Sequence, residues 1–457
     1  MAHSGSTQRM FLSVCLLALG TLRAGERINH EGRILGPLPE VKEPLLFNTP
    51  EADAVVSAMQ IFPTDNAMNE DISKRPLLSN SDAMIKMISD DLARQHRHLK
   101  MAEEMNFVLV PDAQPRADVL LTASADESDD LKPGSKNTAS YPVPPNQPVE
   151  TWPFGTGKLS LKEWQMDEKN VGGDRHAITV QPGSGLAWET WQMKLTAGNP
   201  AWQASNMARF NLNSNALRKD EWTSADAAGL CMFSMIVRYD ECERGMVEHA
   251  MRIVVKRTRN NGHSTAHIYP ATHDAGRAKL PDVPAMGQRL RLKAGFEIPA
   301  AWSKQERAVA LALKKYGAIV ADNGNIFSIS VAPDKRFPSG CWENINKVPT
   351  SAFEVVQTTG PAEGPRSPGK PTVSAGSAQT VALAAGAVLT GSATGSKLTT
   401  TWYLYPGTPA PGTVTFASAA SLATTATFSA AGTYTLMLKA DDGVHTPAFD
   451  AVRITVK

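Results

Sequence analysis

The sequence predicts a mainly β fold of the α+β class, with a β-rich main domain that carries inserted helices and a C-terminal immunoglobulin-like β-sandwich. From about residue 171 onward, short runs rich in β-branched and aromatic residues recur between Gly, Pro and polar turns. The composition changes abruptly after a Gly- and Pro-rich stretch at 360–371, which is typical of a linker. At 457 residues the chain is also too long for one ordinary domain.

The composition is that of a globular protein and excludes several function classes. Apolar residues make up 42% of the chain and charged residues 20%, with a formal net charge of +1. This balance gives no case for nucleic acid as a partner. No stretch reaches the roughly 18 consecutive apolar residues that predict a membrane span.

Residues 1–24 are predicted to be a secretion signal. Arg9 precedes the apolar run MFLSVCLLAL, and small residues follow it. This run is too short to span a bilayer but suits the apolar region of a signal peptide. A buried N-terminal helix is the alternative. We therefore predict a secreted or cell-surface protein, extracellular or periplasmic, whose Pro-rich residues 25–60 form an irregular lead-in.

The main domain is predicted to span 61–357. After a possible cap at Ser79-Asn80-Ser81, apolar residues recur at mostly helical spacing from Asp82 to Glu104, which predicts a helix. Five later runs have β character and are bounded by turns. These predicted strands are HAITV (176–180), LAWETWQM (186–193), MFSMIVRY (232–239), HAMRIVVKR (249–257) and LRLKAGFEI (290–298).

One helix interrupts the predicted strands. Ser303 and Glu306 have capping-box spacing, and Gly317 supplies a C-terminal stop. The following runs AIVAD and IFSISVAP are separated by Asn323-Gly324, which predicts a hairpin.

Three cysteines remain after removal of the signal: Cys231, Cys242 and Cys341. Cys231 and Cys242 flank a strand-like run that would hold them roughly 35 Å apart if extended. A Cys231–Cys242 disulfide would require this run to fold back on itself, and a Cys242–Cys341 disulfide and three free thiols are equally open alternatives.

Residues 372–457 are rich in Ala, Thr, Ser and Gly and contain several strand-like runs. The segments TWYLYPG (401–407), TVTF (413–416) and AAGTYTLMLKADDGVHTPAFDAVRITV (430–456) resemble PKD-like, immunoglobulin-type modules of secreted bacterial proteins. The resemblance implies a spacer or a domain that contacts carbohydrate or protein. Asp441 and Asp442 are interpreted as turn residues rather than calcium ligands.

The main region resembles a family of secreted bacterial proteins. The segments FPTDNAMNEDIS, YPVPPNQPVE, FNLNSNALRKDEWTSADAAGL and ALKKYGAIVADNG carry the resemblance. It implies secretion and one compact domain, without a particular activity. Ala67-Met68-Asn69 stands where relatives more often carry an aromatic, which removes surface on which a sugar would stack.

The polar segment 211–226 is the first candidate for a functional site. It has few residues able to build a core, so we expect ordered loops on a β scaffold, where sites usually lie. We predict that Asn213, Asn215, Arg218, Ser224 and Asp226 form one hydrogen-bonded network. Because hydrolysis of glycosides needs two carboxyl groups, carboxylates near strand ends are catalytic candidates, together with one histidine that could move protons. The catalytic candidates are Asp226, Asp240, His249 and Asp322.

Binding candidates are residues that recognise carboxylates, donate hydrogen bonds or stack on sugars. They are Arg175, His176, Asn213, Asn215, Arg218, Trp222, Arg238, Arg252 and His273. The alternative for the arginines is that they lock acidic loops internally.

These observations favour a carbohydrate-active hydrolase or lyase that acts on an extracellular polysaccharide. The first alternative is a non-catalytic protein that binds a cell-surface or matrix component. The second is a metal-dependent hydrolase that uses His176, His249 and His273. Because the chain has no tight metal-binding motif, no metal site and no cofactor are assigned.

Overall fold

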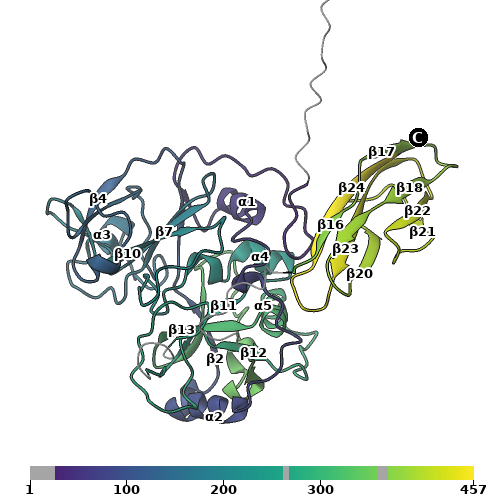
Figure 1. Ribbon diagram of the computed structural model, residues 1–457. Coiled ribbons are helices and arrows are strands. Elements are labelled where there is room, and N and C mark those ends of the chain that lie inside the picture. Colours follow the sequence, from purple (N-terminus) through teal and green to yellow (C-terminus); the bar gives the residue numbers. More distant parts are fainter. Residues whose placement is uncertain (1–25, 261–266, 358–368) are drawn as a thin grey trace, which may run out of the picture.

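The computed structural model describes residues 26–260, 267–357 and 369–457 (Figure 1). The predicted signal and most of the predicted linker lie outside these residues. The described chain is mainly β, as predicted, and its strands form six sheets. Three sheets use strands before residue 357 and three use strands after residue 371. The helices are α1 (Pro50–Ala58), α2 (Ser81–Asp91), α3 (Leu161–Met166), α4 (Tyr239–Arg244) and α5 (Lys304–Lys315).

A six-stranded sheet organises the centre of the main region, in the order β15-β12-β13-β11-β14-β2. Its strands are β2 (Leu99–Glu103), β11 (Met251–Val255), β12 (Arg289–Leu292), β13 (Ala318–Asn323), β14 (Phe327–Val331) and β15 (Phe353–Val355). Strand β11 runs parallel to β13 and antiparallel to β14. Helix α2 packs against β15, and α5 packs against β12 and α4. These neighbours bury every residue of β11, so a charged side chain on β11 must find its partners inside the protein.

The predicted hairpin at Asn323-Gly324 is wrong. β11 lies between β13 and β14, so these two strands do not pair. The Gly324 amide donates to the Val255 carbonyl at 2.9 Å, which places the turn across the end of β11. The buried apolar strand β11 therefore fills the position that a hairpin partner would have taken. The predicted helix after Ser303 is confirmed, with both halves of its capping box formed and Gly317 at a φ of +66°.

The helix predicted from Asp82 to Glu104 is only partly correct. Helix α2 ends at Asp91, and residues from Leu99 to Glu103 form β2 at the edge of the six-stranded sheet. β2 pairs in parallel with β14. Tertiary pairing has overridden the helical spacing of its apolar residues.

The strand predicted at 232–239 is also wrong. Phe233–Met235 is a 3-10 turn, and α4 begins at Tyr239. The buried carboxylate of Glu189 accepts hydrogen bonds from the Met232 and Phe233 amides at 3.0 and 2.9 Å. These bonds satisfy amides at the start of the turn, so the segment does not need a strand partner. The strand predicted at 290–298 keeps only the residues within β12.

Two further sheets face each other beside the central sheet. The five-stranded sheet has the order β1-β3-β6-β7-β10, and the four-stranded sheet has the order β5-β4-β9-β8. Their shared core contains Tyr141, Trp188 and Trp202, and the Tyr141 hydroxyl donates to the Trp188 carbonyl at 3.0 Å. The strands are β1 (Leu45–Leu46), β3 (Val108–Leu109), β4 (Ala117–Leu121), β5 (Thr138–Tyr141), β6 (Ala177–Gln181), β7 (Leu186–Trp191), β8 (Lys194–Leu195), β9 (Trp202–Ala204) and β10 (Asn206–Asn211). β6, β7 and β11 confirm three of the predicted strands.

Residues after 371 form three sheets around their own hydrophobic core, which includes Trp402 and Tyr434. Figure 1 shows these strands in yellow-green, gathered at one side of the molecule. They are β16 (Thr372–Ser374), β17 (Gln379–Val381), β18 (Ala387–Thr390), β19 (Ser392–Thr394), β20 (Thr399–Leu404), β21 (Val414–Phe416), β22 (Ala423–Phe428), β23 (Gly432–Asp441) and β24 (Ala448–Val456). Asp441 and Asp442 accept hydrogen bonds from backbone amides of the turn after β23, as expected for turn residues. The division into independent domains stays a prediction.

Cys231, Cys242 and Cys341 are free thiols, and all three are buried. This settles the alternatives that the sequence left open. The structure contains neither a Cys242–Cys341 bond nor another disulfide among these three residues.

Candidate functional site

The strongest candidate for a functional site centres on Arg252 of β11. Its side chain is only 2% exposed, and its guanidinium donates three hydrogen bonds. The acceptors are Asp226 Oδ1 at 2.7 Å, Asp322 Oδ2 at 2.5 Å and Ser330 Oγ at 3.3 Å. With Glu104, Glu150 and His176, described below, these residues make up what we call the Arg252 cluster.

The register of the central strands brings Asp322 to Arg252. Between Ile253 and Val254 the pairing of β11 with β13 shifts by one residue, so that Asp322 lies opposite Val254. Residues two apart on a strand share a face, which places Asp322 on the same face as Arg252. The bulge at Ala321 thus changes the direction in which the following side chains point, as bulges beside functional sites often do.

Glu104 extends the cluster from the edge of the sheet. It follows β2, and its Oε1 accepts a hydrogen bond from Ser330 Oγ at 3.0 Å. Burial raises the pKa of Glu104 to about 7, and the negative charge of Glu150 adds to the rise while Arg252 opposes it. Near neutral pH this carboxyl group is therefore able either to donate or to accept a proton.

Glu150 and His176 form a buried ion pair beside Glu104. His176 Nδ1 lies 2.9 Å from Glu150 Oε2, and Nε2 lies 3.0 Å from the Ala225 carbonyl oxygen. Both ring nitrogens face acceptors, which requires the doubly protonated imidazolium. Burial alone would lower the pKa of His176, but Glu150 outweighs it and raises the pKa to about 9. Burial likewise pushes the pKa of Glu150 up, and His176 more than reverses this.

Asp226 is the innermost carboxyl group of the cluster. It is fully buried, and its Oδ2 has no hydrogen-bond partner within the described chain. Burial raises the pKa of Asp226 to about 6, against the opposing charge of Arg252. Two carboxyl groups, those of Asp226 and Asp322, thus share one guanidinium, and the carboxyl group of Glu104 is linked to it through Ser330 Oγ. Such crowding favours a bound proton and suits acid–base chemistry.

A second group of charged residues surrounds His249 and Asp240. His249 Nε2 lies 3.2 Å from Glu241 Oε2, and Arg238 contacts Glu241 Oε1 at 2.7 Å. Arg244 bonds Asp240 at 2.5 Å. Burial raises the pKa of Glu241, but Arg238 and His249 outweigh it and lower the pKa to about 2. These contacts make up what we call the His249 cluster.

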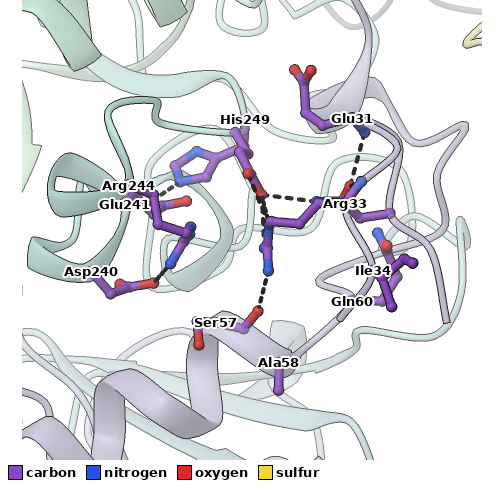
Figure 2. Close-up of polar contacts among 12 residues, drawn as sticks. Glu31, Arg33, Ile34, Ser57, Ala58, Gln60, Asp240, Glu241, Arg244 and His249 are labelled. Atoms are coloured by element: carbon purple, nitrogen blue, oxygen red, sulfur yellow. Dashed lines mark hydrogen bonds and ion pairs between the residues drawn. The ribbon is translucent and has the colours of Figure 1, made fainter. Parts of the chain in front are cut away.

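The lead-in segment covers the His249 cluster. Figure 2 shows Arg33 reaching from this segment to the Ser57 carbonyl, a hydrogen bond of 2.8 Å. Arg33 also pairs with Glu248 at 2.8 Å. The cavity beside the cluster measures about 30 Å³, which is room for one or two water molecules but not for a sugar ring. Asp240, His249 and Arg238 are therefore weaker candidates than the Arg252 cluster.

The predicted single network in the polar segment is wrong. Ser224 Oγ accepts from the Asp226 amide at 2.9 Å, but the other three residues bond elsewhere. Asn213 donates to the Ser184 carbonyl, and Asn215 donates to Asp65. Arg218 pairs with Asp129 and donates to the Glu127 carbonyl. The segment is ordered by separate anchors to distant loops, which no local pattern could reveal.

The remaining binding candidates lie apart from the Arg252 cluster. Arg175 donates to the carbonyls of Met193 and Trp164 at 2.9 and 2.8 Å, so it holds loops together. Trp222 packs against Arg218, whose guanidinium carbon lies 5.7 Å from the ring. His273 Nδ1 bonds the Ala227 carbonyl at 2.7 Å.

Sequence reasoning missed Glu104, Glu150 and Ser330. Glu104 lay within a predicted helix, Glu150 ended a proline-rich turn, and Ser330 lay inside a predicted strand. Their only sequence signal was a polar residue at or near the end of a buried run. Across residues 26–260, 267–357 and 369–457, no three or more His, Cys, Asp or Glu side chains gather as metal ligands. In the same ranges no helix is both long and apolar enough to cross a membrane.

Comparisons with known proteins add little about function. No family model matches the chain, and no curated protein matches it. A solved PKD domain from the KIAA 1837 protein is 25% identical and covers 19% of this chain and 84% of its own, with a TM-score of 0.16. A nucleoside hydrolase-related hypothetical protein from Saccharophagus degradans, associated with carbohydrate metabolism, is 14% identical. It covers 36% of this chain and 40% of its own, with a TM-score of 0.17. Neither low score carries an argument about activity.

Proposed function

We propose that the protein is an extracellular hydrolase that cleaves a polysaccharide, with the Arg252 cluster as its reactive site. The observation that carries the proposal is that Asp226 and Asp322 both bond the buried Arg252, while Glu104 is linked to the same arginine through Ser330 Oγ. Hydrolysis of a glycoside needs one carboxyl group that is protonated and another that is ionised. A shared guanidinium and a low-dielectric setting favour this division of protons.

Within the cluster we assign different roles by exposure. Asp322 is 26% exposed, and it would act as the ionised carboxylate beside the sugar. Glu104 has a pKa raised to about 7 by burial, and it would protonate the leaving oxygen. Asp226 is fully buried, so it is a positioning residue that holds Arg252.

The rival function is a non-catalytic protein that binds a cell-surface or matrix component. Its support is that both ring nitrogens of His176 already have hydrogen-bond partners inside the protein. In that case the Arg252 cluster is a structural ion network, as buried arginines often are.

A degradation screen with matched variants separates the two functions. The purified protein is incubated with a panel of neutral, amino-sugar and acidic polysaccharides and with peptidoglycan, and released reducing ends are measured. Glu104→Gln and Asp322→Asn should each lower the rate by about 10²–10⁴-fold. The exposed Glu168 supplies the control Glu168→Gln, which should keep the full rate. Binding without product from any substrate would support the non-catalytic function instead.

A further inference from the structure

A positively charged groove borders the Arg252 cluster at the end of β11. It measures about 350 Å³, which is within the usual size of ligand-binding clefts. Its walls are the chain just after β11, the segment 275–278 and the last residue of β13, and we call it the Lys256 groove. We propose that the Lys256 groove binds the carboxylates of a polyuronate, an acidic polysaccharide that is then the substrate. This inference rests on the hydrolase function proposed above.

Hydrogen bonds and one close approach of the backbone fix the shape of the groove. The Ala278 amide donates to the Thr258 carbonyl at 3.3 Å, and the Asn260 amide donates to the Ala278 carbonyl at 2.8 Å. An added Cβ at Gly276 would lie 2.3 Å from the Thr258 carbonyl oxygen, so only glycine lets the two segments lie this close. Thr258 Oγ1 donates to Asn323 Oδ1 at 3.2 Å, which joins this wall to β13. Such preorganisation lowers the entropy that is lost when a ligand binds.

The positive charge of the groove remains after its ion pairs are counted. Three cations line it, those of Lys256, Arg257 and Arg277, and none of the described lining residues is acidic. Arg257 is neutralised by Asp91 at the end of α2, to which its Nε donates at 2.7 Å. Lys256 and Arg277 are exposed, and neither side chain has a hydrogen bond or an ion pair within the described chain. Two positive charges are therefore left for a ligand.

These two cations favour carboxylated sugars over neutral ones. The planar guanidinium of Arg277 can take a carboxylate through two parallel hydrogen bonds, and the ammonium of Lys256 can pair with another. A neutral polysaccharide would leave both charges without a counter-charge. A polyuronate carries one carboxylate on each sugar unit, so one bound segment can meet both cations, and this complementarity selects it over neutral polymers.

The groove lies beside Asp322, the ionised carboxylate of the reactive site. Asn323, which lines the groove, directly follows Asp322, and its amide donates to Asp322 Oδ1 at 2.7 Å. Val254 is the strand partner of Asp322, and Lys256 comes two residues later, about 7 Å along the chain at strand spacing. The negative charge of Asp322 would repel an acidic substrate, and the charges of Lys256 and Arg277 oppose this repulsion. The Lys256 groove is thus a neighbouring subsite of the kind that an acidic substrate needs.

Titration calorimetry on the full chain, at low and at high salt, tests the groove with four defined probes. These are the galacturonate hexamer, the mannuronate hexamer, cellohexaose and a carrageenan hexamer, whose anionic groups are sulfate esters. We expect at least one uronate hexamer to bind more tightly than the last two probes, with an affinity that falls as the salt concentration rises. Lys256→Ala and Arg277→Ala should each weaken this binding by about fivefold. Lys136→Ala and Arg307→Ala remove the same charges at other exposed positions and should bind as the wild type does.

Three results would overturn the assignment of the groove. These are no binding of either uronate hexamer, equally tight binding of cellohexaose or the carrageenan hexamer, and wild-type binding by both Lys256→Ala and Arg277→Ala. Both replaced side chains are exposed, so the variants should keep the wild-type midpoint of urea unfolding, which excludes a folding defect. Arg277→Lys, which keeps the charge but loses the planar fork, should weaken binding less than Arg277→Ala does.

The same variants separate a failure of the groove from a failure of the reactive site. Uronate binding without release of reducing ends from any polysaccharide would support the groove and refute the hydrolase. Release of reducing ends from neutral polysaccharides alone would support the hydrolase and refute the groove. If a polyuronate is cleaved, Lys256→Ala and Arg277→Ala should act mainly by raising KM, by about fivefold, because they remove binding that the substrate and the transition state share.

Discussion

Replacing Asp226 by asparagine tests whether the innermost carboxyl group positions Arg252 or reacts. Its Oδ1 accepts from Arg252 Nε at 2.7 Å, while its Oδ2 has no partner in the described chain. In Asp226→Asn the bond to Arg252 loses its negative acceptor, and an amide N–H donor lies where Oδ2 lay. A weakened charged hydrogen bond and a buried unsatisfied donor together predict a loss of about 1–3 kcal/mol in the free energy of unfolding.

The pH dependence of this loss follows from the pKa of Asp226. Burial raises the pKa to about 6 from an ordinary 3.8, so the native state binds a proton that the unfolded state releases. The resulting stability is complete below pH ~4 and disappears as the pH rises through about 6. The variant cannot titrate at this position. It should therefore be more destabilised at pH 5 than at pH 8, by about 1 kcal/mol.

Urea unfolding monitored by tryptophan fluorescence at pH 5 and pH 8 gives both quantities, and the polysaccharide assay gives activity. A destabilised variant that keeps substantial activity supports a positioning role. Unchanged unfolding with abolished activity would mean that Asp226 reacts directly. Unchanged unfolding and unchanged activity, or a larger loss at pH 8 than at pH 5, would refute the description of the Arg252 cluster given above.

Four further outcomes are expected from the sequence and the structure. Arg252→Met should cost about 3–5 kcal/mol of stability in urea unfolding, because it leaves buried carboxylates without a cation. Limited proteolysis should cut first between Gly360 and Lys370 and release a resistant C-terminal fragment, whereas simultaneous loss of both halves would argue against separate domains. Because Glu150 raises the pKa of His176 to about 9 from 6.5, the stability from this pair should be complete below pH ~6.5 and lost as the pH rises through about 9, by about 3 kcal/mol. His176→Gln should lack that pH dependence. A thiol reagent should label Cys231, Cys242 and Cys341 in denaturant and essentially none of these three in the native protein, since all three are buried.

Elements with strong local signals could be predicted from the sequence. Helix α5 carries its own capping box, and β6 and β7 are runs of β-forming residues bounded by turns, so the local sequence was enough to predict these elements. β2 and the 3-10 turn at Phe233 could not be predicted this way. The first depends on pairing with β14, and the second depends on Glu189, more than 40 residues away in sequence.

The residues of the candidate site likewise divide into those that the sequence could predict and those that it could not. Asp226, Asp322, Arg252 and His176 were predicted individually, and the structure brings these four together. Their mutual distances depend on a one-residue bulge in β13 and on the insertion of β11 between two strands. Neither feature can be recognised in the local sequence, since a bulge changes the pairing of strands rather than their composition. Glu104 and Glu150 were missed because their role exists only once β2 lies beside β14.

The exposure of the carboxyl groups bears on the proposed hydrolase function more directly than their number does. A carboxylate that water reaches contributes little stability to an ion network. Here Asp226 is fully buried, whereas Asp322 is 26% exposed and Glu104 is only partly buried. The inner carboxylate fixes Arg252, and Arg252 in turn fixes the carboxylate that solvent can reach. A substrate that displaced this solvent would meet a positioned carboxylate and, at Glu104, a carboxyl group able to deliver a proton near neutral pH. Mutating the exposed members should therefore affect turnover more than folding, and mutating the buried member should do the reverse.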